Sequence, residues 1–170
     1  MILSLVVALS GLGCATVQEV ASTSKKVEPV AAVDLKRYLG TWFEIASIPQ
    51  PFQRECGDPT AEYSMRDDGQ IAVVKRCQRG DRTVGEGIAR IIDHSTNARL
   101  EVSFSGPFWE EYLIIDLDRD YTYAVIGDRK RAGLTILSRE PKLPSWTYAA
   151  IMSRAMAQGY DVTRVKLAER

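Results

Sequence analysis

The amino-acid sequence predicts an all-β fold: an eight-stranded antiparallel up-and-down β-barrel with one C-terminal α-helix packed on its outside. Eight short segments of strand-like composition follow one another, separated by turn-forming residues such as Asp67-Asp68-Gly69 and Gly127-Asp128. The connections are too short for crossover helices, so neighbouring strands must be antiparallel. The predicted strands cover residues 42–48, 61–65, 71–77, 85–92, 100–104, 111–117, 121–126 and 134–138.

Length and composition favour a single globular domain. The chain has 170 residues, of which 45% are hydrophobic and 26% charged, which suits one buried core. Its 22 Lys and Arg residues are balanced by 22 Asp and Glu residues. Because there is no basic excess with which to neutralise phosphates, the composition argues against nucleic acid as a partner.

The N-terminus resembles an export signal. Residues 1–13 carry no charged side chain and are mostly Leu, Val, Ile and Ala, but the run is much shorter than the roughly 20 apolar residues that cross a bilayer. The small residues Ser10, Gly11 and Gly13 precede Cys14, as in a bacterial lipoprotein whose cysteine is acylated. We therefore expect a lipoprotein signal peptide over 1–13 and a membrane anchor at Cys14. The alternative is an ordinary cleaved signal peptide with Cys14 unmodified.

The chain changes in character at residue 34. Residues 14–33 mix Ser, Thr, Lys and Glu with scattered Val and Ala and show no apolar repeat, which predicts a flexible tether. From Asp34 a short helical turn is expected, with Asp34 as its N-cap and Gly40 at its end. The barrel domain is predicted over residues 34–170.

Apolar patterning predicts where the C-terminal helix packs. Residues 113–117, 121–126 and 134–137 are apolar, or nearly so, on both faces, so their outer face needs a cover. A helix from Pro144 to about Gln158 follows them directly and can provide that cover, and residues 162–167 can add one more strand. The residues that lie close to an i, i+3, i+4 stripe on this helix are Trp146, Ala149, Ala150, Ser153, Met156 and Ala157.

Three short motifs resemble the signatures of the lipocalin family. They are Gly40-Thr41-Trp42 before the first strand, Asp118-Arg119-Asp120-Tyr121 at a later turn, and Arg139 at the end of the last barrel strand. The resemblance implies that Arg139 lies over the Trp42 indole and closes one end of the barrel, a contact worth about 1 to 2 kcal/mol. The expected barrel-closing residues are Gly40, Trp42, Asp120, Tyr121 and Arg139.

Longer strings resemble the bacterial outer-membrane lipoprotein branch of this family and its relative apolipoprotein D. The resemblance implies a protein that holds a fatty acid, lysophospholipid or similar apolar ligand, without a cofactor, and is lipid-anchored at the outer membrane facing the periplasm. A homodimer is left open. The strings cover residues 42–46, 51–54, 60–63, 66–69, 102–108 and 136–139.

Strand parity selects the side chains that would line the ligand cavity. If Trp42 and Arg139 point inward, every second residue along their strands does so too, whereas Ile136 packs beneath the helix. Phe52 lies in segment 49–59, which in lipocalins arches over the open end. The alternative for each residue is ordinary filling of the barrel. The ligand-binding candidates are Glu44, Ala46, Phe52, Ala61, Tyr63, Leu100, Val102, Phe104, Thr135 and Leu137.

Cys56 and Cys77 remain if Cys14 is acylated, and in an oxidising compartment a disulfide is their natural pairing. They lie on either side of the hairpin that turns at 68–69, but a two-residue turn sets them directly opposite only if bulges shift the register. The bond and a pair of free thiols therefore both stay open. His94, the single histidine, lies in a turn-like segment, so no metal or catalytic site is predicted.

The leading functional hypothesis is therefore a binding protein without covalent chemistry. A first rival is an enzyme on the same fold, such as an isomerase, which would need a free thiol at Cys56 or Cys77. A second rival is a structural envelope protein whose barrel is filled by its own side chains and binds no lipid.

Overall fold

A single sheet closed on itself dominates the computed structural model, which describes residues 26–49, 56–78 and 81–169. The sheet order is β2-β3-β4-β5-β6-β7-β8-β1-β9, and β1 also pairs with β2, which closes the barrel. The strands are β1 (Gly40–Ser47), β2 (Pro59–Met65), β3 (Ile71–Cys77), β4 (Arg82–Ile91), β5 (Arg99–Ser105), β6 (Phe108–Leu117), β7 (Tyr123–Gly127), β8 (Leu134–Ser138) and β9 (Lys166–Leu167). The helices are α1 (Leu35–Tyr38), α2 (Ser145–Ala157) and the 3₁₀ helix η1 (Val162–Arg164).

The predicted topology is confirmed. Each pair of neighbours from β1 to β8 is antiparallel, so these eight strands form an up-and-down barrel. The added strand expected over 162–167 is shorter than predicted, because residues 162–164 form η1 and only the two residues of β9 pair with β1.

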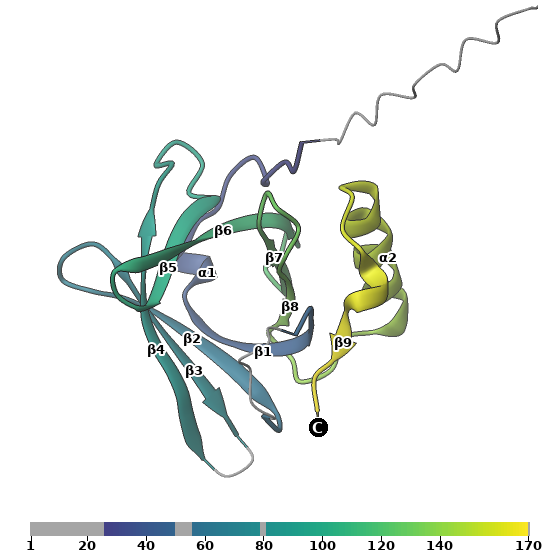
Figure 1. Cartoon of the computed structure of the whole chain (residues 1–170), viewed down its shortest axis with the longest axis horizontal. Coiled ribbons are helices and arrows are strands. Elements are labelled where there is room, and N and C mark those ends of the chain that lie inside the picture. Colours follow the sequence, from purple (N-terminus) through teal and green to yellow (C-terminus); the bar gives the residue numbers. More distant parts are fainter. Residues whose placement is uncertain (1–25, 50–55, 79–80, 170) are drawn as a thin grey trace, which may run out of the picture.

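The barrel has two unlike ends. At the end that we call closed, α1 leads into the start of β1, and β8 finishes beside it. In Figure 1 the strands form a ring, with α1 against its inner side and α2 outside. Trp42 pairs with Ala61, Ala61 with Lys75, and Lys75 with Gly85. Because the strands of a barrel are tilted, each of these steps from one strand to the next leads toward the opposite, open end.

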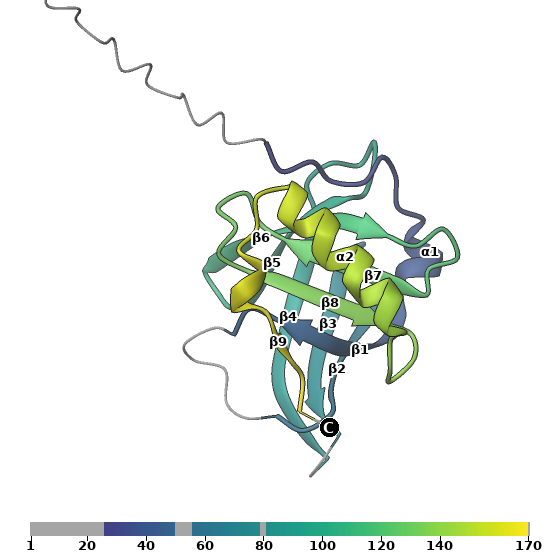
Figure 2. The same ribbon diagram turned by 90° about the vertical axis from the view of Figure 1, so that its right-hand side faces the viewer.

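Two separate hydrophobic cores result from this layout. The inner core lies within the barrel and contains Trp42, Tyr63, Val73 and Leu100. The outer core lies between the barrel and α2, and Ile136 belongs to it as predicted. Figure 2 shows α2 lying across β7 and β8. The strands with two apolar faces are therefore the ones that the helix covers.

The helix lies where the sequence predicts, but its buried face is not the predicted one. The predicted stripe faces solvent, with Trp146 75% and Met156 59% exposed. The buried residues are Ile151 and Ala155, flanked by Tyr148 at the spacing of one helix face. Two stripes of similar apolar character share this helix, and the one that contains Tyr148, Ile151 and Ala155 packs on the sheet. No helix among the described residues is long and apolar enough to cross a membrane.

Part of the predicted tether is packed against the barrel instead. Val27 and Val33 are buried, in the outer and inner core respectively. The backbone N–H of Val30 donates to the carbonyl oxygen of Ile114 at 2.8 Å, and that of Val33 donates to Thr96 at 2.7 Å. The packed domain therefore begins by residue 27, and the valines are too widely spaced to form a helical or strand repeat that would have revealed this.

Candidate functional site

A stacked Trp–Arg pair closes one end of the barrel. Trp42 is completely buried, and its indole N–H donates to the carbonyl oxygen of Tyr38 at 2.8 Å. The guanidinium carbon of Arg139 lies 3.7 Å from the Trp42 ring centroid. Arg139 also donates to the carbonyl oxygens of Arg37, Tyr38, Leu39 and Thr41. Three of these carbonyls end α1, where a helix lacks internal donors, so the arginine caps α1 as it covers the indole.

The other motif residues hold α1 in place. Gly40 has φ +97°, and a Cβ there would lie 3.5 Å from an Arg139 nitrogen. The Tyr121 hydroxyl accepts the N–H of Asp34 at 2.7 Å, and its ring lies 4.2 Å below the guanidinium of Arg37. The backbone N–H of Asp120 donates to a neighbouring carboxylate, that of Asp118.

Asp118 is a turn residue whose role the sequence did not reveal. Its carboxylate accepts the N–H of Asp120 and both the N–H and the hydroxyl of Thr122. Burial opposes ionisation of this carboxyl group, but the bonds from Thr122 and the backbone outweigh it and lower the pKa of Asp118 below its ordinary value. Asp118 therefore stabilises the turn that positions Tyr121.

Most of the predicted inward residues lie on the inner face. Ala61, Tyr63, Leu100, Val102 and Leu137 all belong to the inner core. Glu44 pairs with the inward Leu137, and Thr135 pairs with the inward Ile126, so both share that face. Phe52 lies outside the described residues. That these residues contact a ligand stays a prediction.

The inward prediction for Ala46 is wrong. A register shift between Glu44 and Ala46 interrupts the pairing of β1 with β8. Such a bulge reverses the alternation beyond it, so Ala46 pairs with the outward Ile136 and packs in the outer core beneath α2.

The open half of the inner face is built from small residues and one aromatic ring. Gly85 and Gly87 pair with Lys75 and Val73, so all four positions face inward. A Cβ built on Gly87 would lie 2.8 Å from the ring of Phe104, which shows that this ring rests on the glycine backbone. Phe104 is nevertheless 39% exposed, whereas Leu100 and Val102 on the same strand are buried. Solvent therefore reaches the inner face at this end.

Lys75 adds a cation to the open half. Its ammonium group lies 4.9 Å from the centroid of the Phe104 ring. Its strand neighbours Ile71 and Val73 are inward and buried, whereas Lys75 is only partly buried. Extending the alternation of β3 by one step would have revealed this residue from the sequence alone.

A layer of tyrosines crosses the interior of the barrel. Tyr63 on β2 and Tyr112 on β6 come from opposite walls, and their hydroxyl groups meet in a hydrogen bond across the interior. The ring of Tyr38, on α1, lies 5.4 Å from those of Trp42 and Tyr63. Burial raises the pKa of all three hydroxyl groups, that of Tyr63 to about 12.

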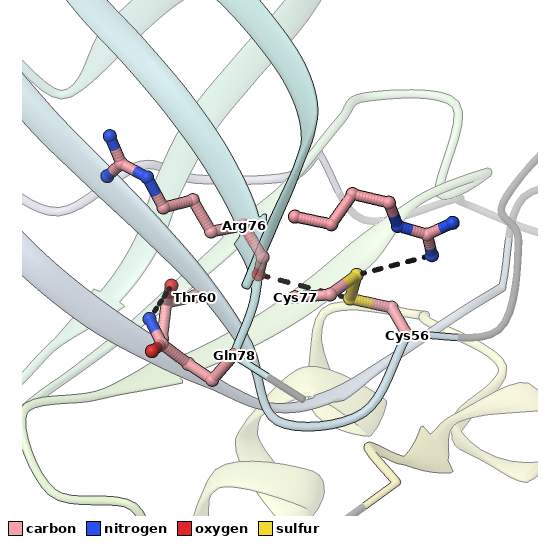
Figure 3. Close-up of a disulfide and its surroundings, with 6 residues drawn as sticks. Cys56, Thr60, Arg76, Cys77 and Gln78 are labelled. Atoms are coloured by element: carbon pink, nitrogen blue, oxygen red, sulfur yellow. Dashed lines mark hydrogen bonds between the residues drawn. A yellow bond between two sulfur atoms is a disulfide. The ribbon is translucent and has the colours of Figure 1, made fainter. Parts of the chain in front are cut away.

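A disulfide joins Cys56 to Cys77 beside the open end, which confirms the predicted pairing (Figure 3). Cys77 lies opposite Pro59, the first residue of β2, and the chain before Pro59 turns back through Asp58 at φ 50°. This turn, rather than a bulge, brings the Cα atoms of the cysteines to 5.2 Å. Within Figure 3, the amide of Gln78 donates to the Thr60 hydroxyl at 3.2 Å and ties the same corner.

A groove of about 400 Å³ lies outside the barrel, between α2 and β7–β8. Its polar wall is already internally bonded, because Arg154 donates to the Asp116 carboxylate at 2.7 Å and to the Tyr123 hydroxyl at 2.9 Å. Among the described residues, no three His, Cys, Asp or Glu side chains come together as a metal site would require. The open half of the barrel is therefore the stronger candidate site.

Comparison with known proteins shows the family to which this barrel belongs. Residues 33–170 match the family model described as a lipocalin-like domain. The chain belongs to the lipocalin family. Outer membrane lipoprotein Blc of Escherichia coli (strain K12) is 40% identical over 134 residues, covering 77% of this lipocalin and 76% of that protein. Apolipoprotein D of Macaca fascicularis is 31% identical over 187 aligned positions, covering 100% and 95% respectively.

Solved structures agree on the fold of this lipocalin. Insecticyanin from the tobacco hornworm Manduca sexta superposes with a TM-score of 0.64 at 18% identity, covering 85% of this chain and 84% of that one. At such low identity the likeness concerns the barrel alone.

Proposed function

We propose that this lipocalin binds one amphiphilic lipid, a fatty acid or a lysophospholipid, in the open half of its barrel and releases it chemically unchanged. The observation that carries the proposal is the Phe104 ring, which lies on the inner face yet is 39% exposed, above the glycine pair Gly85 and Gly87. An apolar surface that faces inward and still reaches solvent is what an acyl chain can cover.

The expected affinity follows from the size of the chain. Each buried CH₂ group contributes about 0.8 kcal/mol, so a dozen carbons give roughly 10 kcal/mol before the cost of association is subtracted. Micromolar binding corresponds to about 8 kcal/mol. Two acyl chains that differ by one methylene group should differ only modestly in affinity, because an apolar wall discriminates poorly between them.

Lys75 supports an anionic head at the mouth. It is a cation on the inner face, beside Phe104 and above the buried residues of β3. A carboxylate or phosphate held there stays close to solvent while its chain extends inward, so neither charge needs to be buried. This orientation suits both lipid classes.

We propose that the protein works at the outer membrane, anchored through an acylated Cys14 and facing the periplasm. The support is the sequence before Cys14 together with a relative whose own name is outer membrane lipoprotein. Because the packed domain begins by Val27, 12 residues lie between it and Cys14, and a chain of that length spans at most roughly 45 Å even when fully extended. That reach keeps the barrel beside the headgroups.

Titration with a fluorescent fatty acid tests binding. We expect a saturable signal at micromolar concentration, and Phe104→Asp should weaken it about tenfold because the new carboxylate stands where the chain packs. Met156→Asp, on the solvent face of α2, is the matched control and should leave it unchanged. A folded protein that gives no saturable signal would favour the rival hypothesis of a filled barrel.

Mass spectrometry of the exported protein tests the anchor and identifies the ligand. The N-terminal peptide should begin at Cys14 and carry a diacylglyceryl group, and native extraction should release a bound fatty acid or lysophospholipid. An N-terminus beyond Cys14 would contradict the anchor, and it would leave the binding proposal untouched.

A further inference from the structure

The tyrosine layer is a polar floor beneath the proposed lipid site. Tyr63 and Tyr112 reach it from opposite walls, and Tyr38 rises to it from α1. Tyr63 pairs with Val73, and Val73 with Gly87, so these steps lead from the floor toward the open end, where Gly85 and the exposed ring of Phe104 lie. Whatever enters the barrel from the open end meets these hydroxyl groups at its inner tip.

The floor has hydrogen-bonding capacity that the described residues leave unused. Three hydroxyl groups bring three protons, and the bond between Tyr63 and Tyr112 uses one of them. The Tyr38 hydroxyl is buried, and within the described part of the chain it has no hydrogen-bond partner. The hydroxyl groups of Tyr63 and Tyr112 are near enough to shift the pKa of Tyr38 as hydrogen-bonding neighbours, but neither meets the distance and angles of a formed hydrogen bond to it. A buried hydroxyl of this kind is costly unless something accepts its proton.

The charges around the floor select the type of acceptor. Glu44 shares the inner face and acts electrostatically on Tyr63, whereas Arg139 acts on Tyr38 from the closed end. Burial keeps the tyrosines protonated, so they are neutral donors. A carboxylate at this depth would meet the negative charge of Glu44, which already acts on Tyr63, and burial would add to its cost. An uncharged oxygen meets neither obstacle.

We propose that the preferred ligand is an oxygenated lipid, whose anionic head stays at the mouth beside Lys75 and whose inner chain carries a hydroxyl group that accepts a hydrogen bond from Tyr38. A plain alkyl tip would leave the Tyr38 proton unsatisfied, whereas a hydroxyl accepts it and retains a proton of its own to donate. The inference rests on the proposed lipid-binding function and adds the chemistry of the ligand's inner end.

Competition between matched lipids tests the proposal. The exported protein is loaded with a fluorescent fatty acid. This probe is then displaced either by plain saturated fatty acids or by their ω-hydroxy derivatives, from tetradecanoate to octadecanoate. An apolar floor would penalise the hydroxyl strongly. We expect the best-fitting hydroxylated acid to bind at least as tightly as its plain partner. In Tyr38→Phe this ratio of affinities should fall about threefold to tenfold, the worth of one hydrogen bond.

The control is Tyr160→Phe, which removes a buried hydroxyl that bonds the Asp128 carbonyl oxygen outside the barrel and should leave the ratio unchanged. Tyr112→Phe provides a second floor variant with the ring retained. The proposal is overturned if hydroxylation weakens binding at every chain length in the wild type, a result that needs no variant, or if Tyr38→Phe keeps the wild-type ratio. If the fluorescent fatty acid itself does not bind, the proposed function fails instead.

Discussion

The two halves of this barrel share the same strands but are filled in different ways. In the closed half, Trp42 and Tyr38 are buried, and Arg139 satisfies the carbonyl groups around them. In the open half, Gly85 and Gly87 replace bulky side chains, and Phe104 reaches solvent. We infer from this difference that the closed half mainly stabilises the fold, whereas the open half mainly binds the ligand. Substitutions at the closed end should lower the free energy of unfolding, whereas those at the open end should change affinity.

The largest effect should come from Trp42→Ala. The indole is fully buried, so removing it leaves a cavity and exposes the capped end of α1, at a cost of about 4 kcal/mol in the free energy of unfolding. Urea denaturation followed by circular dichroism measures the change. Trp146→Ala, at a position 75% exposed, is the control and should stay within about 0.5 kcal/mol of the wild type. Similar losses in both variants would contradict the stabilising role that we assign to the buried indole at the closed end.

The disulfide should be the next largest contributor, although it lies at the open end. Cys56 and Cys77 are 21 residues apart, and closing a loop of that length restricts the unfolded chain by about 3.3 kcal/mol. The double variant C56S/C77S should lose roughly this amount, and a reducing agent should destabilise the wild type but not the variant. If reduction left the free energy of unfolding of the wild type unchanged, the disulfide would not restrict the unfolded chain and this prediction would be wrong.

Local patterns were sufficient to predict the topology. Alternation along β5 and the turn residues between strands fixed the number and direction of the barrel strands, because a hairpin is specified by residues close in sequence. The contact between Arg139 and Trp42 was predicted only through the family motif, since nearly a hundred residues separate the pair.

The errors arose where distant segments decide the outcome. The bulge that turns Ala46 outward is set by the pairing of β1 with β8 and leaves no mark in the sequence. The face of α2 was misassigned because two stripes compete, and the sheet beneath selected the one containing Ile151. Tyr112 went unnoticed as part of the site, since its meeting with Tyr63 depends on two opposite walls.

Alkaline pH should destabilise the protein through the tyrosine layer. Folding raises the pKa of Tyr63 from 10.0 to about 12, because burial disfavours the phenolate. The unfolded chain therefore loses this proton first, so the stability that Tyr63 contributes is fully present below pH 10 and falls by about 3 kcal/mol as pH rises toward 12. Tyr63→Phe should make this slope shallower in urea melts at successive pH values, and Tyr38 and Tyr112, whose pKa values burial also raises, account for the slope that remains. An equally steep slope in the variant would assign the effect to other groups.

Lys75→Met should have the smallest effect, and it should act on affinity rather than stability. Methionine keeps the length and apolar stem of the side chain, so packing against Phe104 is retained while the charge is lost. A partly exposed ion pair contributes up to about 1 kcal/mol, so binding of a fatty-acid anion should weaken about fivefold and lose its dependence on salt. A neutral monoacylglycerol should bind the wild type and the variant equally well, because it has no charge for Lys75 to contact. Lys142→Met, at an exposed position near the closed end, is the matched control. If the neutral lipid weakened as much as the anion, the lysine would act by shaping the wall, and the head of the ligand would have to lie elsewhere.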